Sequence, residues 1–182
     1  MSIENSASTA SRDWQQTIFG ALRRSGVELI AYVPDAGHAV AIAAANGDSA
    51  THAVSCTTEE EGIGICAGAH LGGKRAALLM QSSGVGNCIN MLSLISTCRF
   101  PLLALVTMRG EWAEFNPWQS PMGRVVEQSL DLMGVQCFRA EQTDDVLPQL
   151  EAAAASAFDG EQACALILGQ RLIGRKIWVD RT

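Results

Sequence analysis

Hydrophobic positions along the chain form short continuous apolar runs that alternate with longer segments of helical periodicity. Runs of strand length occur at 29–33, 53–56, 76–80, 102–107, 135–138 and 165–168. Several are apolar at every position, which is typical of strands covered on both faces of a sheet. Helical periodicity extends over 14–24, 59–71, 87–97, 125–133 and 144–158. The alternation predicts an α/β fold, a three-layer, doubly wound, mainly parallel sheet of about six strands.

The length and composition indicate one globular domain. The 182 residues are 48% hydrophobic and 18% charged, which excludes a disordered or fibrous chain. We expect a flexible leader over residues 1–12, which are polar and rich in serine, followed by a single domain over 13–182. Ligands of open α/β sheets bind beyond the carboxyl ends of the strands. The segments that follow strands, 34–38, 57–61, 81–87 and 109–119, are therefore the candidates for a site.

Charge and cysteine usage narrow the class of partner. Thirteen basic and nineteen acidic residues give a net charge of -6, which disfavours nucleic acid because such binding requires a basic surface. No apolar run reaches the ~18 residues of a membrane span. The six cysteines form no Cys-x-x-Cys pair and mostly lie in apolar stretches, as expected of free thiols in a reducing compartment. We expect a cytoplasmic protein that binds neither nucleic acid nor membrane.

Three consecutive glutamates open one of the predicted helices, in the segment Thr57–Glu61. Thr58 as N-cap and Glu61 three residues later would form a capping box, and acidic side chains suit the positive end of the helix dipole. On local sequence alone, these structural roles are favoured by roughly three to one over catalysis. Gly62 and Gly64 follow in the early turns, where each glycine costs up to ~1 kcal/mol relative to alanine. We therefore expect another group to approach this helix closely.

Glycines and histidines near other strand ends give weaker signals. Gly84-Val85-Gly86 could cradle a phosphate at a helix N-terminus or be an ordinary strand-to-helix turn. Ile89 stands where a dinucleotide fingerprint requires a third glycine, so a nicotinamide cofactor is disfavoured. His70 falls on the apolar side of its helix and is expected in the core or an interface. His38 follows a strand end, which is a better place for a substrate contact.

The least regular stretch of the chain, residues 109–123, carries several aromatic residues and prolines. Trp112, Phe115 and Trp118 could line the core, form a partner surface or build a substrate lid. The chain has no Gly-x-Ser-x-Gly elbow, no His-Glu-x-x-His and no P-loop, so the corresponding hydrolase and nucleotidase classes lack their usual support.

In combination, these segments resemble the pyrimidine-binding domain of thiamine-diphosphate enzymes, and specifically the sulfopyruvate/phosphonopyruvate decarboxylase family in its separate alpha-subunit form. The similarity runs from about Trp14 to Gly134, and the matching stretches are Val33–Asp35, Glu59–Ala69, Leu79–Asn87 and Arg109–Gly110. The resemblance implies thiamine diphosphate as cofactor and the decarboxylation of a small 2-oxo acid such as sulfopyruvate or phosphonopyruvate, a carbon–carbon lyase reaction.

The resemblance also implies roles for individual residues. In this superfamily a glutamate stands nine residues before the glycine of a Gly-Tyr-Ala-like run, which Gly68-Ala69-His70 occupies here. This selects Glu59 as the catalytic residue that activates the cofactor, and it reverses the odds given by local sequence. Two further groups are implied: Gln81, Ser82, Ser83 and Gly84 with Glu59 at the cofactor, and Pro34, Asp35, His38, Gln81, Asn116 and Gln119 at the substrate.

A partner chain is part of the same expectation. The family holds Mg²⁺ and the diphosphate with a Gly-Asp-Gly motif in a second domain, and this sequence contains no Gly-Asp-Gly. The resemblance therefore implies a beta subunit that carries the metal site, within a hetero-oligomer in which this chain also self-associates. Where phosphonopyruvate members resemble Glu-Pro-Gln-His, this chain reads Asn116–Gln119, which leaves the acid open. A non-catalytic regulatory subunit of the same fold, or a carboligase using the same ylid chemistry, are the alternatives.

Overall fold

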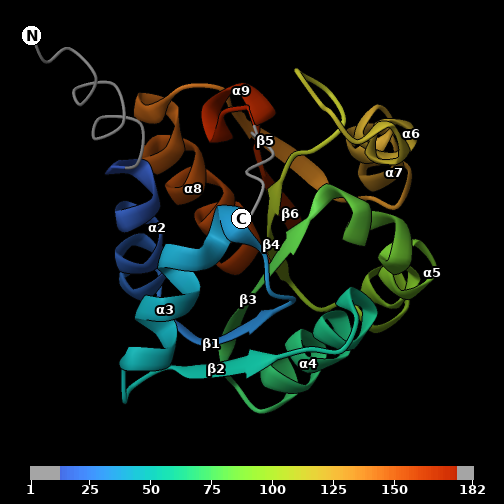
Figure 1. The fold of residues 1–182 in the computed structure, drawn as a ribbon. Coiled ribbons are helices and arrows are strands. Elements are labelled where there is room, and N and C mark those ends of the chain that lie inside the picture. The colour runs from blue at the N-terminus through green and yellow to red at the C-terminus, as the bar shows by residue number, and fades with distance from the viewer. Residues whose placement is uncertain (1–12, 176–182) are drawn as a thin grey trace, which may run out of the picture.

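One parallel sheet organises the molecule. In the computed structural model, residues 13–175 are described and contain a six-stranded sheet with helices on both faces (Figure 1). Its strands are β1 (Val27–Tyr32), β2 (His52–Ser55), β3 (Arg75–Gln81), β4 (Leu102–Thr107), β5 (Gln136–Ala140) and β6 (Ala163–Leu168). They are arranged in the order β2-β1-β3-β4-β6-β5, and every adjacent pair is parallel. This confirms the predicted fold class, and each strand starts and ends within two residues of its predicted run.

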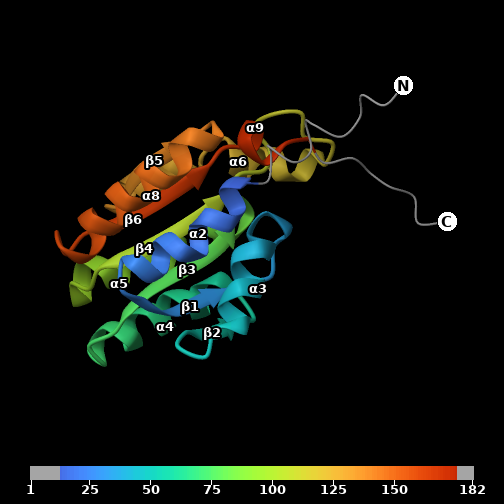
Figure 2. The same ribbon diagram turned by 90° about the vertical axis from the view of Figure 1, so that its left-hand side faces the viewer.

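The helices form two outer layers, as Figure 2 shows from the side. One layer contains α2 (Asp13–Arg24), α3 (Ala39–Gly47) and α8 (Thr143–Phe158), and the other contains α4 (Glu59–Leu71), α5 (Ser82–Cys98) and α7 (Val126–Leu132). Four short helices, η1 (Ala36–His38), η2 (Pro117–Gln119), α6 (Ser120–Gly123) and α9 (Gln170–Ile173), follow strands β1, β4 and β6. The carboxyl edge of the sheet is therefore surrounded by loops and single helical turns.

Two hydrophobic cores lie on opposite faces of the sheet, because successive side chains of a strand point to opposite sides. In β3, Leu79 packs in the core beneath α2 and α8, whereas Leu78 and Met80 pack in the core beneath α4 and α5. Every residue of β4 and β6 is buried, which accounts for their uninterrupted apolar sequence.

Three local predictions differ from the structure. Helix α3 is an alanine-rich element that hydrophobic periodicity did not predict. Helix α5 starts at Ser82, directly after the last residue of β3, instead of at residue 87, so the Gly84-Val85-Gly86 segment is helical rather than a turn. His70 is exposed and so lies outside the core, because the buried positions of α4 are Glu59, Gly62, Ile63, Cys66 and Ala69; its placement in an interface stays a prediction.

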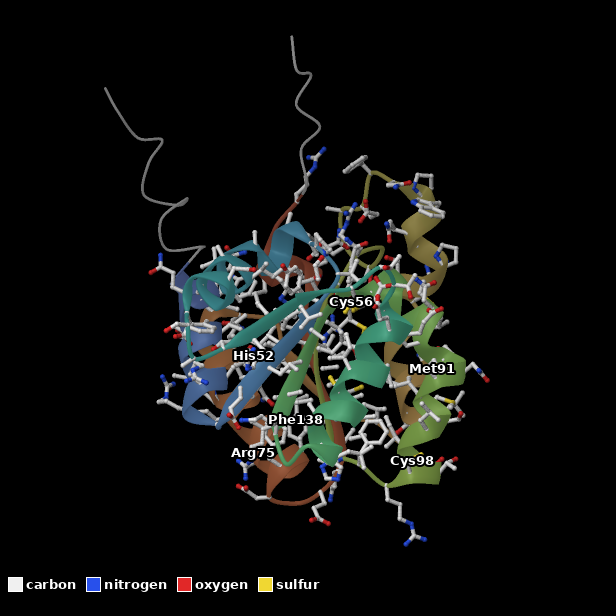
Figure 3. The ribbon with its side chains drawn as sticks, turned by 90° about the horizontal axis from the view of Figure 1, so that it is seen from below. His52, Cys56, Arg75, Met91, Cys98 and Phe138 are labelled. Carbon is white, nitrogen blue, oxygen red and sulfur yellow. The ribbon has the colours of Figure 1, made fainter. Side chains whose placement is uncertain are left out.

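The cysteines behave as expected of free thiols. Cys56, Cys66, Cys88 and Cys164 are buried, Cys137 is partly buried and Cys98 is exposed. Burial raises the pKa of Cys66 to about 12. Figure 3 shows Cys98 at the end of α5, away from the core, whereas Cys56 lies among the packed elements.

Two predictions concern the ends of the chain and membranes. The expected leader over residues 1–12, and residues 176–182 of the expected domain, lie outside the described residues. Within residues 13–175, no helix is sufficiently long and apolar to span a bilayer.

Candidate active site

Asp35 joins the carboxyl ends of three adjacent strands. Its Oδ1 accepts a hydrogen bond from Gln81 Nε2 at 3.0 Å, and its Oδ2 accepts one from Thr107 Oγ1 at 2.7 Å. The Gly37 N–H also donates to Oδ2, at 2.9 Å. Burial alone would raise the pKa of Asp35, but the hydrogen bonds from Thr107, Gln81 and Gly37 hold it below its ordinary value. Asp35 is therefore an ionised carboxylate held in one orientation at neutral pH.

Hydrogen bonds also hold Gln81 and the two residues that follow it in place. Ser83 Oγ donates to Gln81 Oε1 at 3.0 Å, so both ends of the Gln81 amide are engaged. Ser82 is fully buried, and its hydroxyl accepts from the Arg109 N–H at 3.0 Å and lies 3.3 Å from the Arg109 carbonyl oxygen. The predicted cofactor segment 81–84 thus links the ends of β3 and β4.

His38 occupies an interior position. It is 1% exposed, and its Nε2 lies 3.1 Å from the Leu105 carbonyl oxygen and 3.3 Å from that of Met80. Burial lowers the pKa of His38, so the ring is neutral and Nε2–H is the donor to these carbonyl groups. Its Nδ1 is buried without a hydrogen-bond partner in the described part of the chain. The neutral ring spans the ends of β3 and β4, and a ligand reaches it only if a neighbouring segment moves.

Glu59 lies at the start of α4 and faces the first turns of α5. It is 7% exposed, and its Oε2 accepts a hydrogen bond from Asn87 Nδ2 at 2.8 Å. A Cβ at Gly84 would lie under 3.0 Å from the Glu59 carboxyl group, so only glycine leaves room for this side chain. Among residues 13–175, no hydrogen-bond donor to Glu59 Oε1 is present. One carboxylate oxygen is therefore anchored and the other is available.

The predicted capping box is wrong in its main contact. Thr58 is the N-cap residue of α4, but its side chain makes no capping hydrogen bond. The Glu61 carboxylate instead accepts from the Thr57 N–H at 2.6 Å. Glu61 is thus structural, Glu60 is partly exposed, and Glu59 is the buried member of the three.

The small residues of α4 have two different environments. Gly62 lies against Leu78, where a Cβ would clash with the leucine side chain, so the expected close approach occurs at the sheet. Gly64 and Gly68 have open space beside them and are exposed.

Residues 109–119 form a loop with exposed aromatic side chains, which excludes the core-lining interpretation. Trp118 is 76% exposed, and Trp112 and Phe115 are also exposed. At the base of the loop, Arg109 donates two hydrogen bonds of 2.6 Å to the Glu114 carboxylate. These bonds lower the pKa of Glu114 to about 2.

A cavity of about 200 Å³ lies at this edge of the sheet and is lined by Asp35, Gly37, Thr107, Arg109 and Gln170, among others. Pro34 and Asp35 line a second, shallower depression along α3. Asn116 and Gln119 line neither of these, although the Asn116 N–H is bonded to Glu114 and Gln119 Oε1 is buried without a partner among the described residues. Sequence reasoning assigned no site role to Thr107, Asn87 and Gln170. Thr107 and Gln170 are single polar residues at strand ends, which carry no motif, and Asn87 lies inside α5.

The site therefore contains two carboxylates joined by one short segment. Gln81 binds Asp35 and Gly84 contacts Glu59, so residues 81–84 connect an ionised, fully bonded carboxylate with one that keeps an oxygen available. Such a pair can hold a proton at one place and orient a polar substrate at another. Residues 13–175 contain no group of three or more His, Cys, Asp or Glu side chains suited to a metal ion.

Comparison with known proteins identifies the fold and then the family. No protein-family model matches the sequence. The structure resembles a 2-oxoglutarate:ferredoxin oxidoreductase from Magnetococcus marinus with a TM-score of 0.67, over 93% of this chain and 34% of that chain, at 14% sequence identity. This likeness places the chain in the class of α/β domains found in that oxidoreductase.

Sequence similarity is more specific. The chain is 33% identical over 154 residues to sulfopyruvate decarboxylase subunit alpha of Methanococcus maripaludis, covering 84% of this chain and 92% of that subunit. It is also 36% identical over 126 residues to the sulfopyruvate decarboxylase of Methanosarcina acetivorans, covering 69% of this chain but 31% of that longer protein. The chain belongs to the family of sulfopyruvate decarboxylase alpha subunits and is homologous to subunits of carbon–carbon lyases. The resemblance read from the sequence is confirmed.

Proposed function

We propose that this chain is the cofactor-activating subunit of a thiamine-diphosphate-dependent decarboxylase that acts on a small 2-oxo acid of the sulfopyruvate type. The observation that carries the proposal is the position of Glu59, a buried carboxylate with Oε2 bonded to Asn87 and Oε1 available opposite Gly84. A pyrimidine ring nitrogen with a shared proton suits such an acceptor, and the missing Cβ of Gly84 leaves space beside it. The residues present therefore fit the cofactor.

Glu59 would act on a single proton. When bound, thiamine diphosphate supplies the electron sink for the loss of carbon dioxide. Through Oε1, the Glu59 carboxylate would hold a proton shared with a pyrimidine nitrogen of the cofactor, and its negative charge would favour keeping that proton in place. Burial strengthens this interaction, because Glu59 is largely shielded from water between α4 and α5.

The other predicted site residues divide by position. Gly84 lies against Glu59, and the three residues that precede it, Gln81, Ser82 and Ser83, would form the cofactor side of the site with it. Pro34 and Asp35 face the cavities at the strand ends, where we place the substrate. His38 would act on the substrate indirectly, by holding the ends of β3 and β4 through its hydrogen bonds to their carbonyl groups. Asn116 and Gln119 would act on it through the position of the loop that carries them.

A second chain would complete the enzyme. We place Mg²⁺ and the diphosphate on this beta subunit, because the matched part of this chain covers 31% of a sulfopyruvate decarboxylase that is one polypeptide. The exposed face around Gly64 and Gly68 and the exposed loop aromatics are surfaces that such a partner could cover. A hetero-oligomer with at least two copies of each chain follows, since sites of this kind form between domains of different subunits.

The test is the exchange of the thiazolium carbon proton for deuterium, followed by NMR in the complex reconstituted with the beta subunit. Glu59→Gln keeps the size of the side chain but removes its charge, and it should slow exchange by about 100- to 10,000-fold. Glu60→Gln and Glu61→Gln are matched controls on the same helix and should exchange nearly as fast as the wild type.

Two outcomes would contradict the proposal. Slow exchange in Glu60→Gln with normal exchange in Glu59→Gln would show that the wrong glutamate has been assigned. Normal exchange in all three variants would show that this chain does not activate the cofactor, and the regulatory-subunit alternative would then hold.

A further inference from the structure

One buried glutamine forms four hydrogen bonds with residues 111–114 of the loop 109–119, called the aromatic loop below. Gln170 is 1% exposed and is the first residue of α9. Its Oε1 accepts from the backbone N–H groups of Glu111 and Trp112, at 3.0 and 2.9 Å. Its Nε2 donates to Glu114 Oε2 at 2.9 Å, and its backbone N–H donates to Glu111 Oε1 at 2.7 Å. The side-chain amide thus supplies both an acceptor and a donor without carrying a charge.

The groups that Gln170 contacts are themselves the fixed points of the loop. Glu114 binds the Arg109 guanidinium through both carboxylate oxygens, and Glu111 binds Arg139. Arg139 also binds Glu127 and Glu141, so the network continues into α7 and the end of β5. Within this network the Gln170 side chain is the neutral member that contacts two carboxylate-bearing residues and two peptide groups of the loop.

Backbone packing holds the two ends of the aromatic loop together. Gly110 has φ of 84°, and a Cβ there would collide with the Gln119 backbone. A Cβ at Gly123 would collide with the Arg109 carbonyl oxygen. The two ends of the loop therefore touch. Between them, Gln170 binds Glu111, Trp112 and Glu114, and the Arg109 guanidinium lies over the Phe115 ring.

We propose that Gln170 is a positioning residue for the aromatic loop, residues 109–119, whose first residue, Arg109, lines the same cavity as Asp35 and Gln170 itself. The amide places Trp112 by its backbone and Arg109 through Glu114. The consequence for catalysis rests on the proposed function, because this cavity is where the substrate is placed. Gln170 should therefore affect substrate binding and leave proton handling at Glu59 unchanged, since Glu59 contacts α5 instead of the loop.

The informative variant is Gln170→Glu. A protonated carboxyl group can reproduce both the acceptor and the donor of the amide. Once ionised, it would place a negative charge against Glu114 and beside Glu111, with Arg109 and Arg139 already paired to these carboxylates. Burial and the neighbouring carboxylates raise the pKa of the new group, so it should ionise between about pH 5 and about pH 8. Gln162→Glu makes the same change at the exposed amino end of β6 and is the matched control.

The structural readout is ¹⁹F NMR of the full chain labelled with 5-fluorotryptophan, with its four resonances assigned by single Trp→Phe variants. In Gln170→Glu, the Trp112 resonance should match the wild type near pH 5 and shift or narrow near pH 8, whereas that of the buried Trp14 should not move. Gln162→Glu should match the wild type at both pH values. A Trp112 resonance that is unchanged at about pH 8 in Gln170→Glu would overturn the proposal. Gln170→Met, which keeps the length but makes no hydrogen bonds, should shift the resonance at both pH values.

The functional readout uses sulfopyruvate with the complex reconstituted with the beta subunit. Relative to the wild type, Gln170→Glu should raise KM by about tenfold or more at pH 8 and much less at pH 5, with kcat changed much less, because a displaced loop lowers the binding-competent fraction. A fall in kcat with unchanged KM would contradict the positioning role. Thiazolium exchange should stay at the wild-type rate in Gln170→Glu, whereas failure of the proposed function would appear in the Glu59→Gln exchange experiment and leave the ¹⁹F result intact.

Discussion

Gly84→Ala should separate the fold from the function of the Glu59 site. A Cβ at this position would lie under 3.0 Å from the Glu59 carboxyl group, where ordinary contacts are 3.4–4 Å, so the carboxylate must move by about 1 Å. Glutamate is flexible, so this shift costs little stability beyond the Asn87 hydrogen bond, about 1 kcal/mol. The better helix propensity of alanine offsets a similar amount, up to ~1 kcal/mol.

The expected result is a chain that folds normally but activates its cofactor poorly. Thermal unfolding should shift by no more than about 2–4 °C. Thiazolium exchange in the reconstituted complex should fall about 100-fold, since a displacement of 1 Å in a positioned group has effects of this size. Gly20→Ala in the middle of α2, where the new Cβ makes an ordinary contact with Arg24, is the control and should not slow exchange. Wild-type exchange in Gly84→Ala would refute the reasoning, because Glu59 would then act without the position described.

Two further predictions concern stability and reactivity. Glu114→Gln should destabilise the chain at pH 7 by about 1.5–3 kcal/mol, because the variant loses charge-assisted hydrogen bonds to Arg109 that lower the pKa of Glu114 to about 2. This contribution is present above about pH 4.5 and is lost as pH falls towards about 2, so urea unfolding of wild type and variant should converge on acidification. An equal difference in the free energy of unfolding above about pH 4.5 and near pH 2 would contradict this. In the folded chain at pH 7.5, iodoacetamide should alkylate the exposed Cys98 and leave Cys66 unmodified until the chain unfolds, as peptide mass spectrometry would show.

The sheet could be predicted because its strands are buried on both faces and so leave continuous apolar runs. β4 and β6 are buried at every residue, and their predicted and observed limits agree within two residues. The start of α5 could not be predicted in the same way. Ser82, Ser83 and Gly84 have the composition of a turn, and they are helical because tertiary contacts with Arg109 and Glu59 favour them there.

The candidate site could be predicted only in part from the sequence. Local sequence favoured structural roles for the three glutamates, with Glu61 in a capping box, and the resemblance to the decarboxylase family was needed to select Glu59. The structure adds that Thr58 makes no capping contact with its side chain. The environment of Asp35 depends on Thr107, which is 72 residues away, and the loop depends on Gln170, which is 58 residues from Trp112. Contacts at such separations have no signature in a single sequence.

The positions of the two carboxylates give a physical reason for dividing the site into halves. Asp35 is bonded on both oxygens by groups from β3, β4 and η1, and it shares its cavity with Arg109 and Gln170. Glu59 is bonded on one oxygen and depends on the absence of a side chain at residue 84. Because residues 81–84 connect the two, a change that displaces the backbone of this segment should alter both halves. Gln170→Glu acts on the loop and Gly84→Ala on the Glu59 side chain, so each should alter one half. Under the proposed function, substrate affinity and cofactor activation are therefore separable by mutation. If Gln170→Glu and Gly84→Ala each changed both KM and thiazolium exchange, the site would work as a single unit.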